Sequence, residues 1–200
     1  MPKNAIDIKR LYKGFKGQSV LKGVDLLVKQ GEYFGLVGMN GAGKTTLIKS
    51  LLDFCHVDQG DIQIFDVSHR ETRARRKLAF LPERFVPPYY LTGREFLRYM
   101  AKLHGVSFRR EDVERVFHHL DLDLNALSRP VRTYSKGMAQ KLGLATCLLS
   151  GRHLLVLDEP MSGLDPKARA LFKDYLLKAK EHGQTLFFTT HLLHDVESLC

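Results

Sequence analysis

Short runs of consecutive apolar residues recur along the chain, and each is followed by a stretch with helical spacing. The clearest runs occupy residues 33–37, 154–157 and 186–188. Because their residues are apolar at successive rather than alternating positions, we expect both faces of each strand to be covered, as in a parallel sheet. Crossover helices must then join the strands. The pattern predicts an α/β fold.

Two other regions have different patterns of apolar residues and glycines. Residues 5–11 and 24–28 are β-like pieces interrupted by Gly14, Gly17 and Gly23, which predicts a small antiparallel sheet beside the α/β core. Residues 84–150 have helical spacing throughout, which predicts an inserted helical lobe. The apolar positions that carry this spacing are Phe96, Leu97, Met100 and Leu103, and a second helix is expected near residues 111–120.

The chain therefore divides into three expected parts. Residues 1–83 hold the first part of the α/β core and the antiparallel sheet. Residues 84–150 form the helical lobe, and residues 151–200 complete the core as far as the sequence runs.

Composition narrows the class of protein. No stretch reaches the roughly 18 apolar residues that a membrane span needs, and the amino terminus lacks the apolar core of a signal peptide, so we expect a cytosolic chain. Cys55, Cys147 and Cys200 lie far apart, which indicates neither a disulfide framework nor zinc. The net charge of +9 favours an anionic partner without choosing among nucleotide, nucleic acid and lipid. We interpret the basic run 69–77 as a solvated helix face.

A glycine-rich loop carries the first candidate chemistry. Residues 38–45 fit G-x-x-x-x-G-K-[ST], follow an apolar strand and open a helical stretch, which predicts a P-loop NTPase core that binds ATP and Mg²⁺. Lys44 would neutralise the outer phosphates, Thr45 would ligate Mg²⁺, and Thr46 would reach an inner phosphate. The expected nucleotide contacts in this loop are Gly38, Asn40, Gly41, Ala42, Gly43, Lys44, Thr45 and Thr46.

Polar residues at two later strand ends supply the second candidate chemistry. Asp158 and Glu159 follow run 154–157, and His191 follows the apolar segment 185–190. In an open α/β sheet these side chains emerge at the ligand-binding edge. We expect Asp158 to hold Mg²⁺, Glu159 to act as general base, and His191 to sense the γ-phosphate or hold the attacking water. The alternatives are acids that mark a strand end and a structural histidine.

A short segment before Asp158 connects these motifs to a known family. Residues 134–138, Tyr-Ser-Lys-Gly-Met, followed by Gln140, resemble the Leu-Ser-Gly-Gly-Gln signature of ABC-transporter ATPases. Ser135 and Gly137 match outright, whereas the residues between and beside them depart in a way similar to some export-type members. Ser135 also fits the N-cap of a helix that runs to about residue 149, which is a purely structural alternative.

The resemblance implies an assembly. In this family the signature faces the P-loop of a second subunit, so Ser135 and Gly137 would bind ATP across a head-to-tail homodimer or heterodimer that drives transmembrane permease subunits. The chain would lie at the cytoplasmic face of the membrane through those partners. Asp165 matches the family's D-loop, yet before Pro166 it is equally a helix N-cap.

Two further site residues come from the same resemblance. Phe15 matches the aromatic that stacks on adenine, although Tyr12 could take this role instead. The structural alternative is that Phe15 packs in the hydrophobic core. Glu83 stands where the family usually has glutamine, and its carboxylate could ligate Mg²⁺. Members of the family normally continue beyond the position of His191, so we expect this sequence to be part of a longer protein.

The resemblance predicts the ATP-hydrolysing motor subunit of a transporter, with export weakly favoured. A soluble nucleic-acid-associated ABC-type ATPase is the alternative that the positive charge permits. A regulatory nucleotide-binding module without turnover is the third possibility, and the presence of Asp158, Glu159 and His191 disfavours it.

Overall fold

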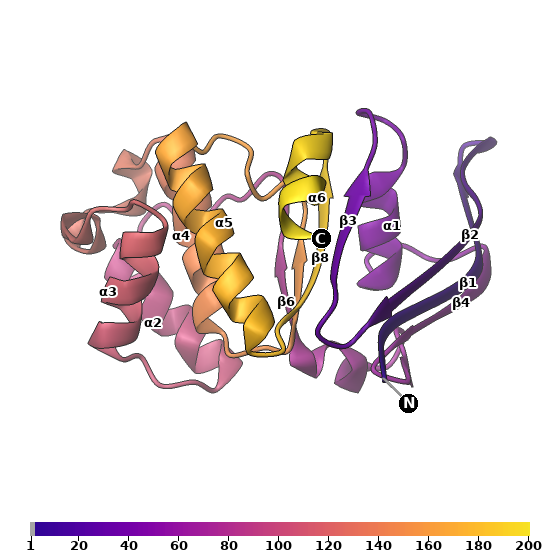
Figure 1. The fold of residues 1–200 in the computed structure, drawn as a ribbon, viewed down its shortest axis with the longest axis horizontal. Coiled ribbons are helices and arrows are strands. Elements are labelled where there is room, and N and C mark those ends of the chain that lie inside the picture. Colours follow the sequence, from indigo (N-terminus) through magenta and orange to yellow (C-terminus); the bar gives the residue numbers. More distant parts are fainter. Residues whose placement is uncertain (1–2) are drawn as a thin grey trace.

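The computed structural model describes residues 3–200, whose strands form two four-stranded sheets (Figure 1). One is antiparallel, with strand order β2-β1-β4-β5, and the other is parallel, with order β3-β8-β7-β6. The strands are β1 (Asn4–Phe15), β2 (Gln18–Lys29), β3 (Tyr33–Val37), β4 (Gln59–Ile64), β5 (Val67–Ser68), β6 (Leu78–Leu81), β7 (Leu154–Leu157) and β8 (Thr185–Thr190). The predicted α/β class with a flanking antiparallel sheet is confirmed.

Helices cover both faces of the parallel sheet. The α-helices are α1 (Lys44–Leu51), α2 (Gly93–His104), α3 (Arg110–His119), α4 (Lys136–Leu149), α5 (Pro166–Glu181) and α6 (Leu193–Leu199). Three short 3-10 helices are η1 (Thr72–Lys77), η2 (Leu124–Ser128) and η3 (Val131–Thr133). No helix in residues 3–200 is both long enough and apolar enough to span a membrane.

Helix α1 lies between the two sheets (Figure 1). Its Ile48 and Leu51 are fully buried in a cluster that also contains Leu154 and Val156 of β7 and Phe187 of β8. Each such side chain contributes about 1.5–3 kcal/mol when it is removed from water. Since α1 begins directly after the loop that follows β3, this cluster fixes the position of that loop.

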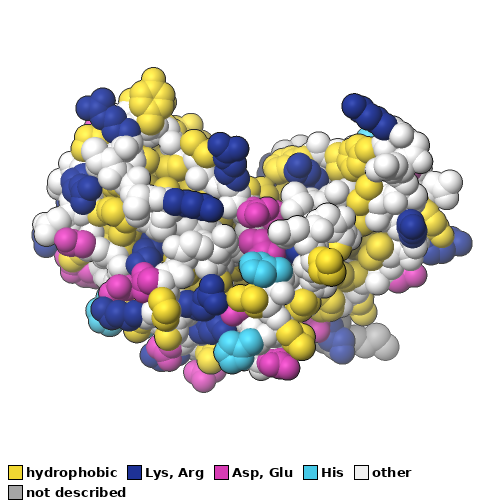
Figure 2. Space-filling model, turned by 90° about the horizontal axis from the view of Figure 1, so that it is seen from above, with side chains coloured by type: hydrophobic (Ala, Val, Ile, Leu, Met, Phe, Trp, Pro, Cys, Tyr) yellow, Lys and Arg dark blue, Asp and Glu magenta, His cyan; other side chains and the backbone are white. Residues whose placement is uncertain are grey.

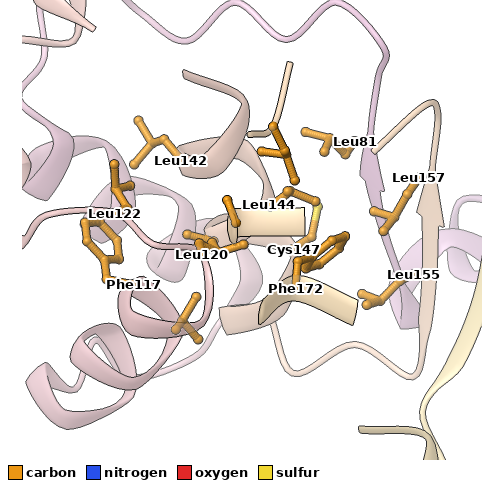
Figure 3. Close-up of a cluster of buried hydrophobic side chains, with 14 of the residues drawn as sticks. Leu81, Phe117, Leu120, Leu122, Leu142, Leu144, Cys147, Leu155, Leu157 and Phe172 are labelled. Atoms are coloured by element: carbon orange, nitrogen blue, oxygen red, sulfur yellow. The ribbon is translucent and has the colours of Figure 1, made fainter. Parts of the chain in front are cut away.

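The opposite face of the parallel sheet packs on α4 and α5. Leu155 and Leu157 of β7 meet Phe172 of α5 and Leu144 and Cys147 of α4 (Figure 3). Successive residues of β7 thus enter two different clusters, which is why its apolar run does not alternate. Burial raises the pKa of the Cys147 thiol to about 12, so this side chain stays protonated.

The segment between β6 and β7 contains α2, α3, η2, η3 and α4, with α2 and α3 packed against α4 (Figure 1). Thr92 begins α2 with a capping box: its hydroxyl accepts from the Glu95 amide at 3.2 Å, and Glu95 accepts from the Thr92 amide at 2.8 Å. Phe96 and Leu97 are buried as the helical spacing requires.

Two expectations from the sequence hold only in part. β1 and β2 are each 12 residues long and run through Gly14 and Gly23, because shifts in pairing, as between Lys13 and Gly14, absorb the irregular positions. Most residues of the basic run 69–77 are exposed, as expected, but the run does not form one α-helix. Its later part is the 3-10 helix η1, in which Ala74 is buried against the core.

Candidate functional site

Residues from three parallel strands meet at one edge of the sheet. The glycine-rich loop follows β3, Asp158 and Glu159 follow β7, and His191 follows β8. Figure 2 looks onto this edge, where acidic side chains and a histidine lie near the middle of the face beside a notch. Parallel pairing of β3, β8 and β7 is therefore what brings segments more than 100 positions apart into one site.

The loop between β3 and α1 forms a cavity of about 330 Å³. Gly41 and Gly43 have φ of +84° and +92°, a left-handed conformation that glycine adopts without steric cost. Gly43 caps α1 without a side-chain hydrogen bond, so the first amides of the helix are open to an anion. The cavity is lined by Val20, Met39, Asn40, Gly41, Gly43, Lys44, Thr45, Thr46, Glu83 and Glu159.

Lys44 is held by oxygens that a phosphate could replace. Its Nζ donates to the carbonyl oxygens of Gly38 at 2.6 Å and Met39 at 3.3 Å. The same nitrogen lies 3.4 Å from Oε1 of Glu159, and both side chains are 9% exposed. Oε1 of Glu159 is buried and accepts no hydrogen bond. A buried acceptor without a donor is costly, so this corner of the cavity fits a ligand that brings one.

Thr45 and Asp158 form an oxygen pair beside Lys44. The Thr45 hydroxyl donates to Oδ2 of Asp158 at 2.9 Å, and Asp158 is 2% exposed. Mg²⁺ is commonly held by one or two such oxygens together with phosphate oxygens and waters, so this pair fits the ion. Glu83 is exposed and lines the same cavity. Within residues 3–200, no three His, Cys, Asp or Glu side chains lie close enough to hold a metal by themselves.

Glu159 and His191 are in direct contact. Nδ1 of His191 lies 2.9 Å from Oε2 of Glu159, and the histidine side chain is 54% exposed. Glu159 has φ of +49°, an unusual conformation for a residue with a side chain, which costs on the order of 1–3 kcal/mol. Such strain is typical of functional sites, and here it directs a buried carboxylate toward both Lys44 and His191.

Thr189 is a site residue that the sequence analysis missed. Its hydroxyl donates to Oδ1 of Asp158 at 2.5 Å and accepts the backbone N–H of Glu159 at 3.0 Å. The pairing of Leu157 with Phe188 brings Asp158 level with Thr189. Thr189 directly follows Phe188, the last residue of β8 that pairs with β7. The sequence alone does not give this register, so it could not show that Thr189 reaches Asp158.

The two residues matched to the signature do not line this cavity. Ser135 caps α4, with its hydroxyl accepting the Met138 amide at 3.2 Å, as the N-cap alternative predicted. Gly137 packs so closely on the loop between β7 and α5 that a Cβ there would lie 2.8 Å from the Gly163 carbonyl oxygen. Asp165 likewise caps α5 by accepting from the Ala168 amide at 2.9 Å.

The two candidate aromatics also lie outside the cavity lining. Phe15 is 46% exposed, at the turn from β1 to β2, with Nζ of Lys13 5.0 Å from its ring centre. Tyr12 is 42% exposed. Their rings are therefore available to solvent, whereas Val20 is the apolar residue from this hairpin that reaches the loop cavity.

The chain is similar in sequence and in structure to known ATP-binding proteins of ABC transporters. The family model described as ABC transporter matches residues 21–162. An uncharacterised ABC transporter ATP-binding protein of Synechocystis is 38% identical over 97% of this chain, and a Nod factor export ATP-binding protein I of Burkholderia lata is 35% identical over all of it. A solved ATP-binding subunit of an ABC transporter shares 32% identity with a TM-score of 0.88, covering 98% of this chain and 83% of its own.

A more distant structure shows the same fold. A dimeric ATP-binding cassette bound to ADP and Pi is 22% identical, with a TM-score of 0.83 over 97% of this chain and 90% of its own. The chain spans 57% of the Synechocystis protein and 67% of the Burkholderia protein.

Proposed function

The chain belongs to the ABC transporter family, and we propose that it is the part of a transporter motor subunit that binds and hydrolyses ATP. One observation carries the proposal. Lys44, Thr45 and Glu159 line a single cavity, with a 3.4 Å ion pair between Lys44 and Glu159, and Asp158 joins them through its 2.9 Å hydrogen bond with Thr45.

The proposed binding step exchanges internal contacts for contacts to the nucleotide. Lys44 leaves the carbonyl oxygens of Gly38 and Met39 and binds phosphate oxygens, while the open amides before α1 and the hydroxyl of Thr46 hold the inner phosphates. Mg²⁺, when bound by Thr45 and Asp158, would neutralise the phosphate charge. Adenine stacking is our proposal for Phe15, with Tyr12 as the alternative.

The proposed chemical step belongs to Glu159 and His191. Glu159 accepts a proton from the attacking water, and His191 keeps the carboxylate in place through the 2.9 Å contact. Thr189 fixes the backbone amide of Glu159 from the other side. Glu83, at the mouth of the cavity, is proposed as a further ligand of the ion or of a water bound to it.

The proposed active form is a head-to-tail dimer. Ser135 and Gly137 lie at the open amino end of α4 and outside the loop cavity of their own chain, so they are free to meet the nucleotide of a second chain. The three expected parts, residues 1–83, 84–150 and 151–200, would then be a core, a signature-bearing lobe and the continuation of the core.

The proposed membrane partner docks on the segment after β6. Val86, Tyr89 and Tyr90 are 75%, 69% and 71% exposed, and they lie three to seven positions after Glu83. Exposed apolar groups gathered on one segment are typical of a binding surface. A permease bound there would hold the chain at the cytoplasmic face of the membrane. Relatives named for Nod factor export support export as the direction.

Glu159→Gln tests this function because it keeps the size of the side chain and removes the base. We expect ATP turnover to fall at least about 100-fold, ATP binding to persist, and a dimer to accumulate with ATP on a sizing column. Glu197→Gln, an exposed acid on α6, is the matched control and should turn over normally. Unchanged turnover in Glu159→Gln would remove it from the base role, and ATP binding that is insensitive to Lys44→Ala would overturn the proposed function.

A further inference from the structure

A second cavity, of about 540 Å³, lies at the opposite edge of the parallel sheet. The turns at residues 151–153 and 182–184, which lead into β7 and β8, line what we call its floor, and α3 and α5 line its wall. Asp158 and His191 leave the carboxyl ends of the same two strands. Because β8 alone has six residues, or about 20 Å of strand, this cavity is separate from the phosphate-loop site.

The side chains around this cavity are basic. Arg115, Arg152 and Lys178 line it together with His119, His153 and His182. None of the lining residues is an aspartate or a glutamate. Burial lowers the pKa of His119, and the charge of nearby Lys178 lowers it further, as expected where positive charge is concentrated.

The cations here are available to an anion. Arg152 makes no ion pair within residues 3–200, and its guanidinium donates to the carbonyl oxygen of His104 at 2.7 Å and to Nδ1 of that histidine at 3.3 Å. Lys178 pairs with Asp174 at 2.8 Å, and Arg115 pairs with Asp112 at 2.6 Å. Both pairs are solvent-exposed, and exposed pairs contribute little, so they can be exchanged for a stronger anionic ligand.

The floor and one wall of the cavity are preorganised. The Gln184 amide donates to the carbonyl oxygens of Arg152 at 3.0 Å and His153 at 2.9 Å, which fixes the turn that carries both residues. The rings of His119 and Tyr175 pack edge to face with centres 5.2 Å apart. Each helix therefore supplies both a cation and a ring to the cavity: Arg115 and His119 on α3, and Lys178 and Tyr175 on α5.

We infer that this cavity binds a small phosphorylated molecule with a planar ring, of the size of a nucleoside monophosphate. Arg152 and Lys178 bind the phosphate, since guanidinium and ammonium groups are the usual donors to phosphate oxygens. The ring lies against Tyr175. The volume falls within the roughly 300–1,000 Å³ typical of small-molecule sites. This cavity shares no lining residue with the phosphate-loop cavity, so binding here does not depend on ATP hydrolysis.

Equilibrium dialysis of the whole chain with AMP tests the inference. We expect saturable binding that Lys178→Gln weakens about tenfold, because one charged hydrogen-bond donor to the phosphate is lost. Lys167→Gln is the matched control: it lies on the same helix and also has an ion pair at the surface, with Asp121 at 2.7 Å, but it does not line the cavity. Lys44→Ala separates the two sites and should leave this binding unchanged.

A variant that fills the cavity separates loss of binding from loss of folding. Ala179 lines the cavity from α5, and Ala179→Leu should abolish AMP binding while circular dichroism and ATP binding stay normal. Equal AMP binding in Lys178→Gln and wild type would overturn the inference, as would loss of AMP binding in Lys44→Ala. Inorganic phosphate that binds as tightly as AMP would refute the role of the ring. Binding to phosphatidylglycerol vesicles that depends on Lys178, without AMP binding, would assign the surface to lipid headgroups instead.

Discussion

Asp195→Asn should destabilise the fold and slow the chemistry, because Asp195 is the buried charge that anchors α6. The residue is 1% exposed. Its Oδ1 lies 2.9 Å from Nζ of Lys173 on α5, and its Oδ2 accepts from the Thr190 hydroxyl at 3.2 Å. The Thr190 hydroxyl also accepts the Leu192 amide at 3.1 Å, so the residues immediately before and after His191 both belong to this network.

The magnitude follows from the burial of the pair. The side chains of Lys173 and Asp195 are 13% and 2% exposed. Removing one partner of a buried pair typically costs about 3–5 kcal/mol, because the other charge is left in a poorly solvated site. Lys173 retains a little access to water, so we expect about 3 kcal/mol. Replacing both, as Lys173→Met with Asp195→Leu, should recover most of the loss, since an apolar pair carries no desolvation cost.

Urea unfolding of Asp195→Asn measures the loss, and Lys173→Met, Asp195→Leu and their combination together close a double-mutant cycle. Asp174→Asn, which removes the exposed pair with Lys178 on the same helix, is the control and should change the midpoint little. ATP turnover, corrected for the folded fraction, should also fall in Asp195→Asn because the loop of His191 loosens. A loss below about 1 kcal/mol in Asp195→Asn would refute the reasoning, since a buried pair of this geometry could not then be what anchors α6.

Three further outcomes follow from single contacts. Gly137→Ala places a methyl group 2.8 Å from the Gly163 carbonyl oxygen, and thermal unfolding should show a loss of about 1–3 kcal/mol; a wild-type midpoint would contradict the close packing. Thr189→Val leaves Oδ1 of Asp158 without its donor and should cost about 1–3 kcal/mol in urea, whereas no loss would remove Thr189 from the site. The hydrogen bond from the Ala168 amide lowers the pKa of Asp165 below its ordinary value of 3.8. Its contribution to stability is therefore present above pH 3.8 and is lost as the pH falls below that value. Asp165→Asn should flatten the dependence of unfolding free energy on pH in this range, and an unchanged slope would contradict the assignment.

The sequence allowed the positions of the candidate site residues to be predicted where those positions depend on local spacing. Glycines at fixed offsets before Lys44 and Thr45 form a loop of known conformation, and apolar runs ending in Asp158 and His191 must deliver these residues to one edge of a parallel sheet. These inferences need only the identity and direction of each strand.

Features that depend on register or on packing from several elements were not predictable. Thr189 reaches Asp158 only because β7 and β8 pair in one particular register. Gly14 lies inside β1 because shifts in pairing absorb it, which strand propensity does not foresee. The basic cavity combines residues of α3, α5 and two turns, so no local sequence pattern predicts it. The orientation of Phe15 likewise depends on the turn that carries it.

The most direct test of the central claim is to locate the metal and the terminal phosphate in crystals of Glu159→Gln grown with ATP and Mn²⁺. The anomalous signal of Mn²⁺ should lie between the Thr45 hydroxyl and the Asp158 carboxylate, with the γ-phosphate in contact with Lys44. A manganese ion bound away from Thr45 and Asp158, or a nucleotide whose phosphates lie outside the loop of residues 38–45, would contradict the account.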